Sequence, residues 1–110
     1  MKHDLQSLRQ RVADRPDNLL AQFSFGQALF EEGLFAEAIA PLQCCAEKRG
    51  DWMLARVLLG KCYRELHQPE EARACFRQAL DLAVTQHHDD PAEELRQILA
   101  EMGPPPSAKE

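Results

Sequence analysis

The chain has 110 residues, the length of one small domain, and a net charge of −5. This acidic balance disfavours nucleic acid as a partner, because nucleic-acid binding needs a basic face, and no run of Lys and Arg supports a membrane-surface role. The polar first residues lack the apolar segment of a secretory signal, and no stretch approaches the roughly 18 apolar residues of a membrane span. We therefore expect a cytoplasmic protein.

The N-terminal segment, residues 1–16, predicts one helix over residues 3–14. Leu5, Leu8 and Val12 have the spacing of one helical face, and Pro16 stops the helix. Because this apolar face must be buried against another element, we expect the helix to cover the front face of the first full hairpin, which follows it.

Residues 19–52 predict a first helical hairpin. Asp17 or Asn18 suits the N-cap of a helix over 19–32, and Gly33 suits its end. A second helix is expected over 35–48. Pro41 lies inside that helix, where it removes a hydrogen bond, so we expect a small bend.

Residues 53–86 predict a second hairpin, with helices over about 52–66 and 69–85. We expect Asp51 to cap the first of these helices and Pro69 to occupy the first turn of the second. Small residues, Gly60 and Ala72, let the two helices approach closely, and larger ones fill the space around the contact. The larger residues are Leu59, Tyr63 and Phe76.

Residues 90–103 predict a last helix, capped by Asp90 and ended by Gly103. Its apolar stripe is formed by Leu95, Ile98, Leu99 and Met102. The proline-rich segment that follows, residues 104–110, is expected to be a disordered tail.

The two hairpins are related by a shift of 34 residues without a gap. The pairs are Phe25 with Leu59, Gly26 with Gly60, Leu29 with Tyr63, Ala38 with Ala72, Leu42 with Phe76 and Cys45 with Ala79. A period of about 34 residues with a helix–turn–helix in each unit resembles the tetratricopeptide repeat family. Gln22 and Arg56 depart from the pattern, because they stand where the family often has an aromatic residue.

The resemblance implies an all-α solenoid of αα-hairpins. Residues 1–16 correspond to the second helix of a hairpin, which makes a half repeat, and residues 19–52 and 53–86 are two full repeats. The last helix has Glu93, Glu94 and Gln97 at the packing positions, so it is expected to cap the open end of the solenoid. Together these segments form one domain over residues 1–103.

The resemblance also implies a protein–protein interaction module that binds a peptide or helix in a concave groove. Four repeat positions of each first helix point into that groove. These residues are Leu20, Phe23, Gln27 and Phe30, then Leu54, Val57, Lys61 and Arg64. The groove is expected to be apolar with a basic edge, which suits an apolar peptide or an amphipathic helix with an acidic end. Two alternatives stay open: the end helices either leave this surface free or cover part of it.

A second hypothesis is a structural one, in which the short solenoid self-associates as a homodimer. About three repeats are usually needed for stability, and this chain has fewer. A charge on an exposed apolar face, at Leu20 or Met102, is then expected to break the dimer.

Catalytic, metal and cofactor sites find little support in the sequence. The cysteines are Cys44, Cys45, Cys62 and Cys75, and they include no CxxC pair. We interpret them as small core or groove-wall residues in a reducing compartment. The run at 87–90, His-His-Asp-Asp, has metal-type ligands, but adjacent residues rarely converge on one ion. We therefore expect no enzyme, no metal and no cofactor.

Overall fold

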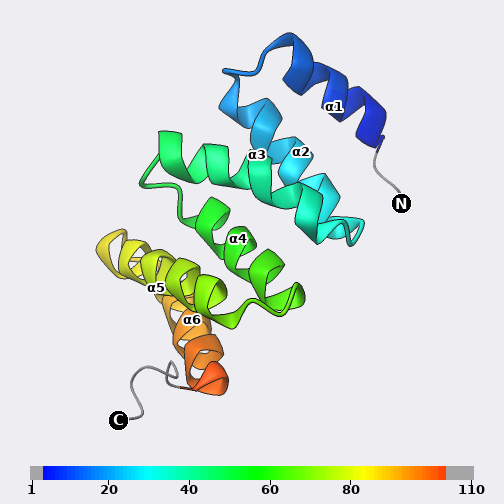
Figure 1. Cartoon of the computed structure of the whole chain (residues 1–110). Coiled ribbons are helices and arrows are strands. Elements are labelled where there is room, and N and C mark those ends of the chain that lie inside the picture. The colour runs from blue at the N-terminus through cyan, green and yellow to red at the C-terminus, as the bar shows by residue number, and fades with distance from the viewer. Residues whose placement is uncertain (1–3, 104–110) are drawn as a thin grey trace.

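The computed structural model describes residues 4–103, and within them it contains six helices and no strand (Figure 1). The helices are α1 (Leu5–Asp14), α2 (Leu19–Glu31), α3 (Phe35–Lys48), α4 (Met53–Glu65), α5 (Pro69–Thr85) and α6 (Asp89–Met102). The all-α hairpin architecture predicted from the sequence is confirmed. The tail expected over 104–110, like residues 1–3, lies outside the described residues.

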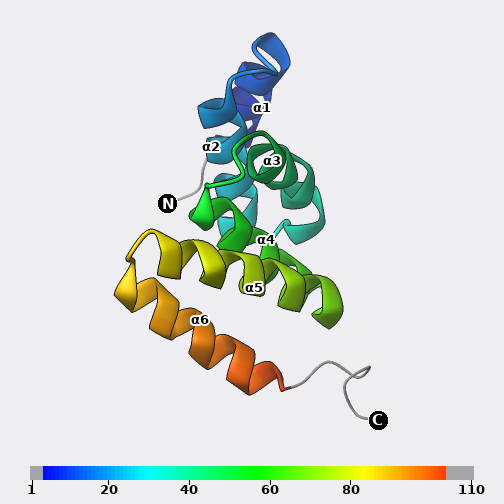
Figure 2. The same cartoon turned by 90° about the vertical axis from the view of Figure 1, so that its left-hand side faces the viewer.

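Each helix packs mainly on its neighbours in the chain, so the stack is elongated, with α1 and α6 at opposite ends. Figure 2 shows α5 and α6 lying side by side in opposite directions. Besides these sequential contacts, α2 also touches α4 directly. Residues of α4 and α6 in turn line a common pocket, so we group α2, α4 and α6 as one side of the stack and call it the A layer.

Local signals explain where several helices begin and end. The Asn18 side chain accepts a hydrogen bond from the Ala21 N–H at 3.2 Å, which caps α2 as expected. Asp4 caps α1 in the same way, by accepting from the Ser7 N–H at 3.1 Å, so that helix begins at Leu5 rather than residue 3. Gly33 has φ +80° and closes the end of α2.

Two expected caps are wrong. Trp52, rather than Asp51, is the N-cap of α4, and it makes no side-chain capping bond. The Asp51 carboxylate accepts instead from Arg49 Nε at 3.5 Å. At the last helix, His88 rather than Asp90 is the N-cap, so the cap lies two residues earlier than predicted and α6 begins at Asp89. Asp89 and Asp90 lie within its first turn, where their charge favours the positive end of the helix dipole.

The close crossing within each hairpin depends on a glycine. A Cβ atom at Gly60 would lie 2.6–2.9 Å from three ring atoms of Phe76. The matching Cβ at Gly26 would lie 2.8 Å from Cγ of Leu42. Gly60 is thus met by the Phe76 ring rather than by Ala72, while α3 runs unbroken through Pro41, which is buried.

The buried side chains form two clusters. The first lies between α2, α3 and α4, and the partly buried Leu5, Leu8 and Val12 of α1 pack against it, as their shared face predicted. The second joins α5 to α6 around Phe76. Tyr63 of α4 packs against both clusters and so connects them.

Polar side chains replace the aromatic residue that the repeat pattern lacks. Gln22 Nε2 donates to the Pro16 carbonyl at 2.9 Å. Arg56, 34 residues later, donates to the equivalent carbonyl of Gly50 at 3.4 Å. It also donates to the carbonyl of Ala46 and to Oε1 of Gln78, at 3.2 and 2.7 Å. The bonds to the carbonyls tie each hairpin to the segment before it, and the bond to Gln78 joins the two helices of the second hairpin, a role that sequence spacing did not predict.

Candidate functional site

The eight residues expected in a groove are spread along the A layer, and the structure brings only some of them together. Leu54, Val57 and Lys61 of α4 line one pocket of about 160 Å³ with residues of α6. The α6 residues of this pocket are Pro91, Glu94, Leu95 and Ile98, and Met53 completes it. We call this the α4–α6 pocket.

The α4–α6 pocket has an apolar floor and charged walls. Leu95 is buried and Ile98 is partly buried, whereas Leu54 remains 44% exposed at the rim. Lys61 and Glu94 bring opposite charges to the same pocket. A cavity of about this size can hold a six-membered ring or a similar apolar group. The pocket can therefore hold one apolar side chain beside a polar or charged group.

The contribution of α6 to this pocket was not expected from the sequence. Pro91, Leu95 and Ile98 lie 34 residues after Val57, Lys61 and Arg64, at three of the repeat positions used to choose the groove residues. The same register, continued into the last helix, would have found them. The altered packing positions at Glu93 and Glu94 hid this signal.

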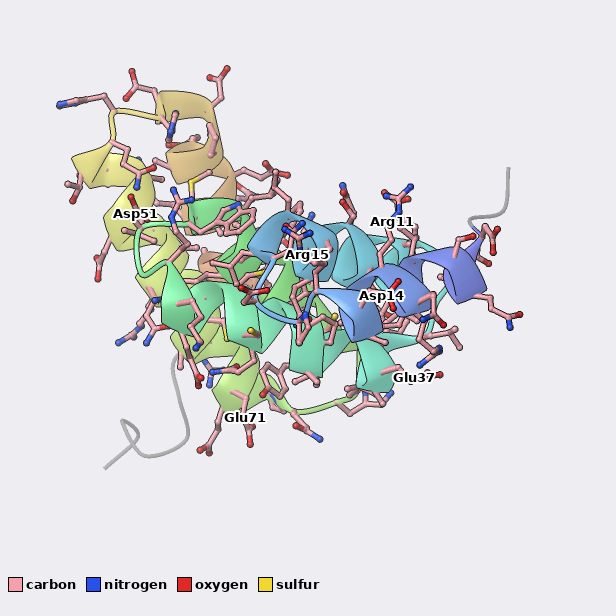
Figure 3. All side chains as sticks on the ribbon, turned by 90° about the horizontal axis from the view of Figure 1, so that it is seen from above. Arg11, Asp14, Arg15, Glu37, Asp51 and Glu71 are labelled. Atoms are coloured by element: carbon pink, nitrogen blue, oxygen red, sulfur yellow. The ribbon has the colours of Figure 1, made fainter. Side chains whose placement is uncertain are left out.

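Leu20 lies in a separate depression between α1 and α2. It is 71% exposed and shares a space of about 270 Å³ with Arg11, Asp14 and Arg15. Figure 3 labels these three charged side chains, of which Arg11 and Asp14 lie on the C-terminal half of α1 and Arg15 follows the helix as its C-cap. α1 therefore flanks Leu20 without covering it, and the predicted apolar surface is free at this point.

The aromatic residues of α2 serve packing contacts. Phe23 stacks on Trp52 with ring centroids 4.7 Å apart, and the guanidinium carbon of Arg49 lies 5.6 Å from the Trp52 centroid. Phe30 meets Phe35 edge-on at 5.5 Å. Because its ring holds the α3–α4 turn against α2, Phe23 is less available to a ligand than the sequence implied.

The two remaining groove candidates are partly buried. Gln27 lies on α2 between Phe23 and Phe30. The Arg64 guanidinium carbon lies 5.6 Å from the centroid of the Phe76 ring, inside the second hairpin. Arg64 thus covers a core aromatic ring rather than forming a free basic edge with Lys61.

Two of the thiols, Cys45 and Cys62, are buried, whereas Cys44 and Cys75 are partly exposed. Burial raises the pKa of Cys45 to about 11, with a smaller contribution from Cys44, and burial likewise raises that of Cys62 to about 11. The four cysteines are unpaired. A high pKa keeps the thiol protonated and a poor nucleophile.

Within residues 4–103 no three His, Cys, Asp or Glu side chains are grouped as a metal site would require. His87, which has φ +62°, belongs to the turn that joins α5 to α6. No helix in this part of the chain is long and apolar enough to cross a membrane.

Paired helices in a 34-residue register, crossed at Gly26 and Gly60, define a tetratricopeptide-type helical repeat protein. The family model described as "Anaphase-promoting complex, cyclosome, subunit 3", a family of this repeat type, matches residues 7–79. The chain belongs to that family. No curated protein matches the sequence.

Solved structures share the fold at low sequence identity. Protein BPP2914 from Bordetella parapertussis is 22% identical with a TM-score of 0.77, over 93% of this chain and 89% of that one. A double mutant named MamA RS-1 ArsTM is 19% identical with a TM-score of 0.69, over 89% of this chain and 63% of that one. Family and fold together are those of protein-interaction scaffolds, which are generally not catalytic.

Proposed function

We propose that the protein is a non-enzymatic interaction module that binds a short segment of a partner protein along the A layer. The α4–α6 pocket carries this proposal. Three of the predicted groove residues, Leu54, Val57 and Lys61, converge there, and an apolar floor lies below them. A partner segment would place one apolar side chain in the pocket.

The charges at the pocket rim favour an amphipathic segment. Lys61 can pair with a carboxylate that follows the apolar anchor, and Glu94 can pair with a cation on the other side. The exposed Leu20 offers a second apolar contact toward α1. A peptide or helix of a partner protein fits this pattern better than a small metabolite does, because the contacts are spread along the layer. The four unpaired cysteines support the cytoplasm as the place of action.

The test is a pull-down from host lysate with matched variants. Leu54→Glu places a charge at the rim of the pocket, whereas Val84→Glu places the same charge at a 50% exposed apolar residue of α5 outside it. We expect a partner that the wild type and Val84→Glu retain and that Leu54→Glu loses. Circular dichroism should show equal helix content in the three proteins.

Identical protein lists from Leu54→Glu and the wild type would contradict the proposed site. The wild-type preparation should also be run by sedimentation at several concentrations. A dimer that Leu20→Glu dissociates, with no captured partner, would favour the self-association hypothesis instead.

A further inference from the structure

A buried arginine on α5 lacks a partner for its charge. The Arg73 side chain belongs to a residue only 7% exposed, and its Nε and Nη1 atoms have no hydrogen-bond acceptor in the structure. Nη2 donates to the Met102 carbonyl at the end of α6, at a long 3.4 Å. An ionised group in this situation has lost its hydration and gained one weak, neutral contact in return.

No carboxylate of the described chain compensates this charge. Within residues 4–103, ion pairs join Arg9 to Glu37, Arg49 to Asp51 and Arg96 to Glu93, and none of them involves Arg73. Glu70, one turn before Arg73, lines the same depression without forming an ion pair with it. The guanidinium therefore has buried N–H donors that no carboxylate of residues 4–103 satisfies, and such donors call for an acceptor from another molecule.

The position of Arg73 in the repeat makes this charge unusual within the chain. Arg73 lines a depression of about 240 Å³ together with Glu70, Ala74 and Arg77. The residues 34 positions earlier line the corresponding depression on α3, and they are Ala36, Ile39, Ala40 and Gln43. An apolar Ile39 thus stands where the second hairpin has Arg73. The depression on α3 is therefore largely apolar, whereas the corresponding depression on α5 contains two arginines.

We propose that the Arg73 depression binds a carboxylate from an acidic segment of a partner protein. The planar guanidinium can hold a carboxylate through two parallel N–H donors, and Arg77, one turn further along α5, adds a second cation at the rim. Nε and Nη1 are buried in the unbound protein, so binding requires the outer torsion angles of Arg73 to rotate and present the Nε–Nη edge to the ligand. The site lies on α5 and is independent of the α4–α6 pocket.

The charges around the depression favour a small anion over a nucleic acid. Arg73 and Arg77 outnumber the single carboxylate of Glu70 at the depression, so an anion is attracted there, whereas the whole chain carries a net charge of −5. A nucleic acid presents a long row of phosphates, so it meets the repulsion of the whole chain as well. The comparison with inorganic phosphate in the test below separates a carboxylate from a phosphate.

The test is an NMR titration of the full chain, observing the Arg73 Nε–Hε signal and the amide of Ala74. The probe is a capped pentapeptide of alternating Gly and Glu, and the control is the same peptide with Gln in place of Glu. We expect the Glu peptide to shift both signals and the Gln peptide to leave them unchanged. In Arg73→Met, binding followed at the Ala74 amide should weaken about tenfold or more, because the charge-assisted bonds are lost.

Two further variants separate geometry from net charge. Arg73→Lys keeps the charge but cannot form the two parallel bonds, so it should bind with intermediate strength. Arg96→Met removes the same charge from the exposed face of α6 and should change the affinity less than twofold. Equal weakening in Arg96→Met and Arg73→Met would overturn the proposal, because it would reduce the effect to overall charge.

Stability without ligand supplies an independent test. Arg73→Met replaces an uncompensated buried charge with an apolar chain, so its unfolding temperature should equal or exceed that of the wild type. A clear fall would show that the guanidinium is already satisfied in the protein, which would overturn the proposal. Inorganic phosphate that shifts the signals as strongly as the Glu peptide would overturn the carboxylate assignment. If Glu110→Gln binds the Glu peptide more tightly than the wild type, the carboxylate of Glu110 competes for Arg73. This result would overturn the assignment of the ligand to a partner protein.

Discussion

Replacing Gly60 by alanine tests the close crossing of the second hairpin. The new methyl carbon would lie 2.6–2.9 Å from three atoms of the Phe76 ring, which is fully buried and rigid. Overpacking of this kind costs about 1–3 kcal/mol, and the contact with a ring puts the cost near the upper end. Alanine regains about 1 kcal/mol of helix propensity over glycine. The net expectation is a loss of about 2 kcal/mol in the free energy of unfolding, or roughly 8–16 °C in Tm.

The assay is urea and thermal unfolding followed by circular dichroism, with Gly26→Ala as the matched variant. Its methyl would meet Leu42 Cγ and Cδ2 at 2.8 and 2.9 Å, atoms that a flexible side chain can move, so the loss should be smaller. In the double variant Gly60→Ala/Phe76→Leu, the coupling energy should recover at least about 1 kcal/mol. A neutral or stabilising Gly60→Ala would refute the reasoning, because it would show that the Phe76 ring yields.

Two further predictions concern side chains that lie between helices, the partly buried Arg56 and Gln22 and the buried Cys45 and Cys62. Arg56→Met should lower the free energy of unfolding by about 2 kcal/mol, because it removes hydrogen bonds to two carbonyls and to Gln78. Gln22→Ala removes one such bond, so its loss should be about half as large. Urea unfolding of both variants measures these losses, and equal losses would contradict the prediction. Burial raises the pKa of Cys45 and Cys62 from 9.0 to about 11, so the unfolded thiols ionise first and stability should fall as the pH rises from about 9 to 11. Thermal unfolding across this range should show a smaller fall in Cys45→Ala/Cys62→Ala than in wild type, and an unchanged slope would count against the assignment.

The fold could be predicted from the sequence because local signals and the repeat spacing agree. Gly33 ends α2 with positive φ, and Pro69 begins α5, where each residue type is favoured. The turn after α4 is closed by His67, at φ +60°, in the position that Gly33 holds one repeat earlier. Residue preference alone does not predict a positive φ at a histidine, whereas the 34-residue register, which aligns His67 with Gly33, does.

The candidate site was less predictable, because it depends on contacts between distant helices. Leu54, Val57 and Lys61 share a pocket because α6 lies beside them, and the placement of α6 follows from the packing of Leu95 rather than from any local pattern. Phe23 occupies a groove position in the repeat, yet its stacking on Trp52 could not be read from spacing. The eight groove residues as a set remain a prediction for the binding experiments.

The part played by Tyr63 has a consequence for cooperativity. In a linear stack, each helix gains stability from its nearest neighbours, so cooperative unfolding depends on the contacts that cross each boundary. Tyr63 is partly buried and packs against both buried clusters, so its contacts couple the stability of α1–α4 to that of α5 and α6. Binding at the α4–α6 pocket bridges that same boundary. A ligand held there would add contacts across this boundary and would therefore stabilise both regions of the stack together.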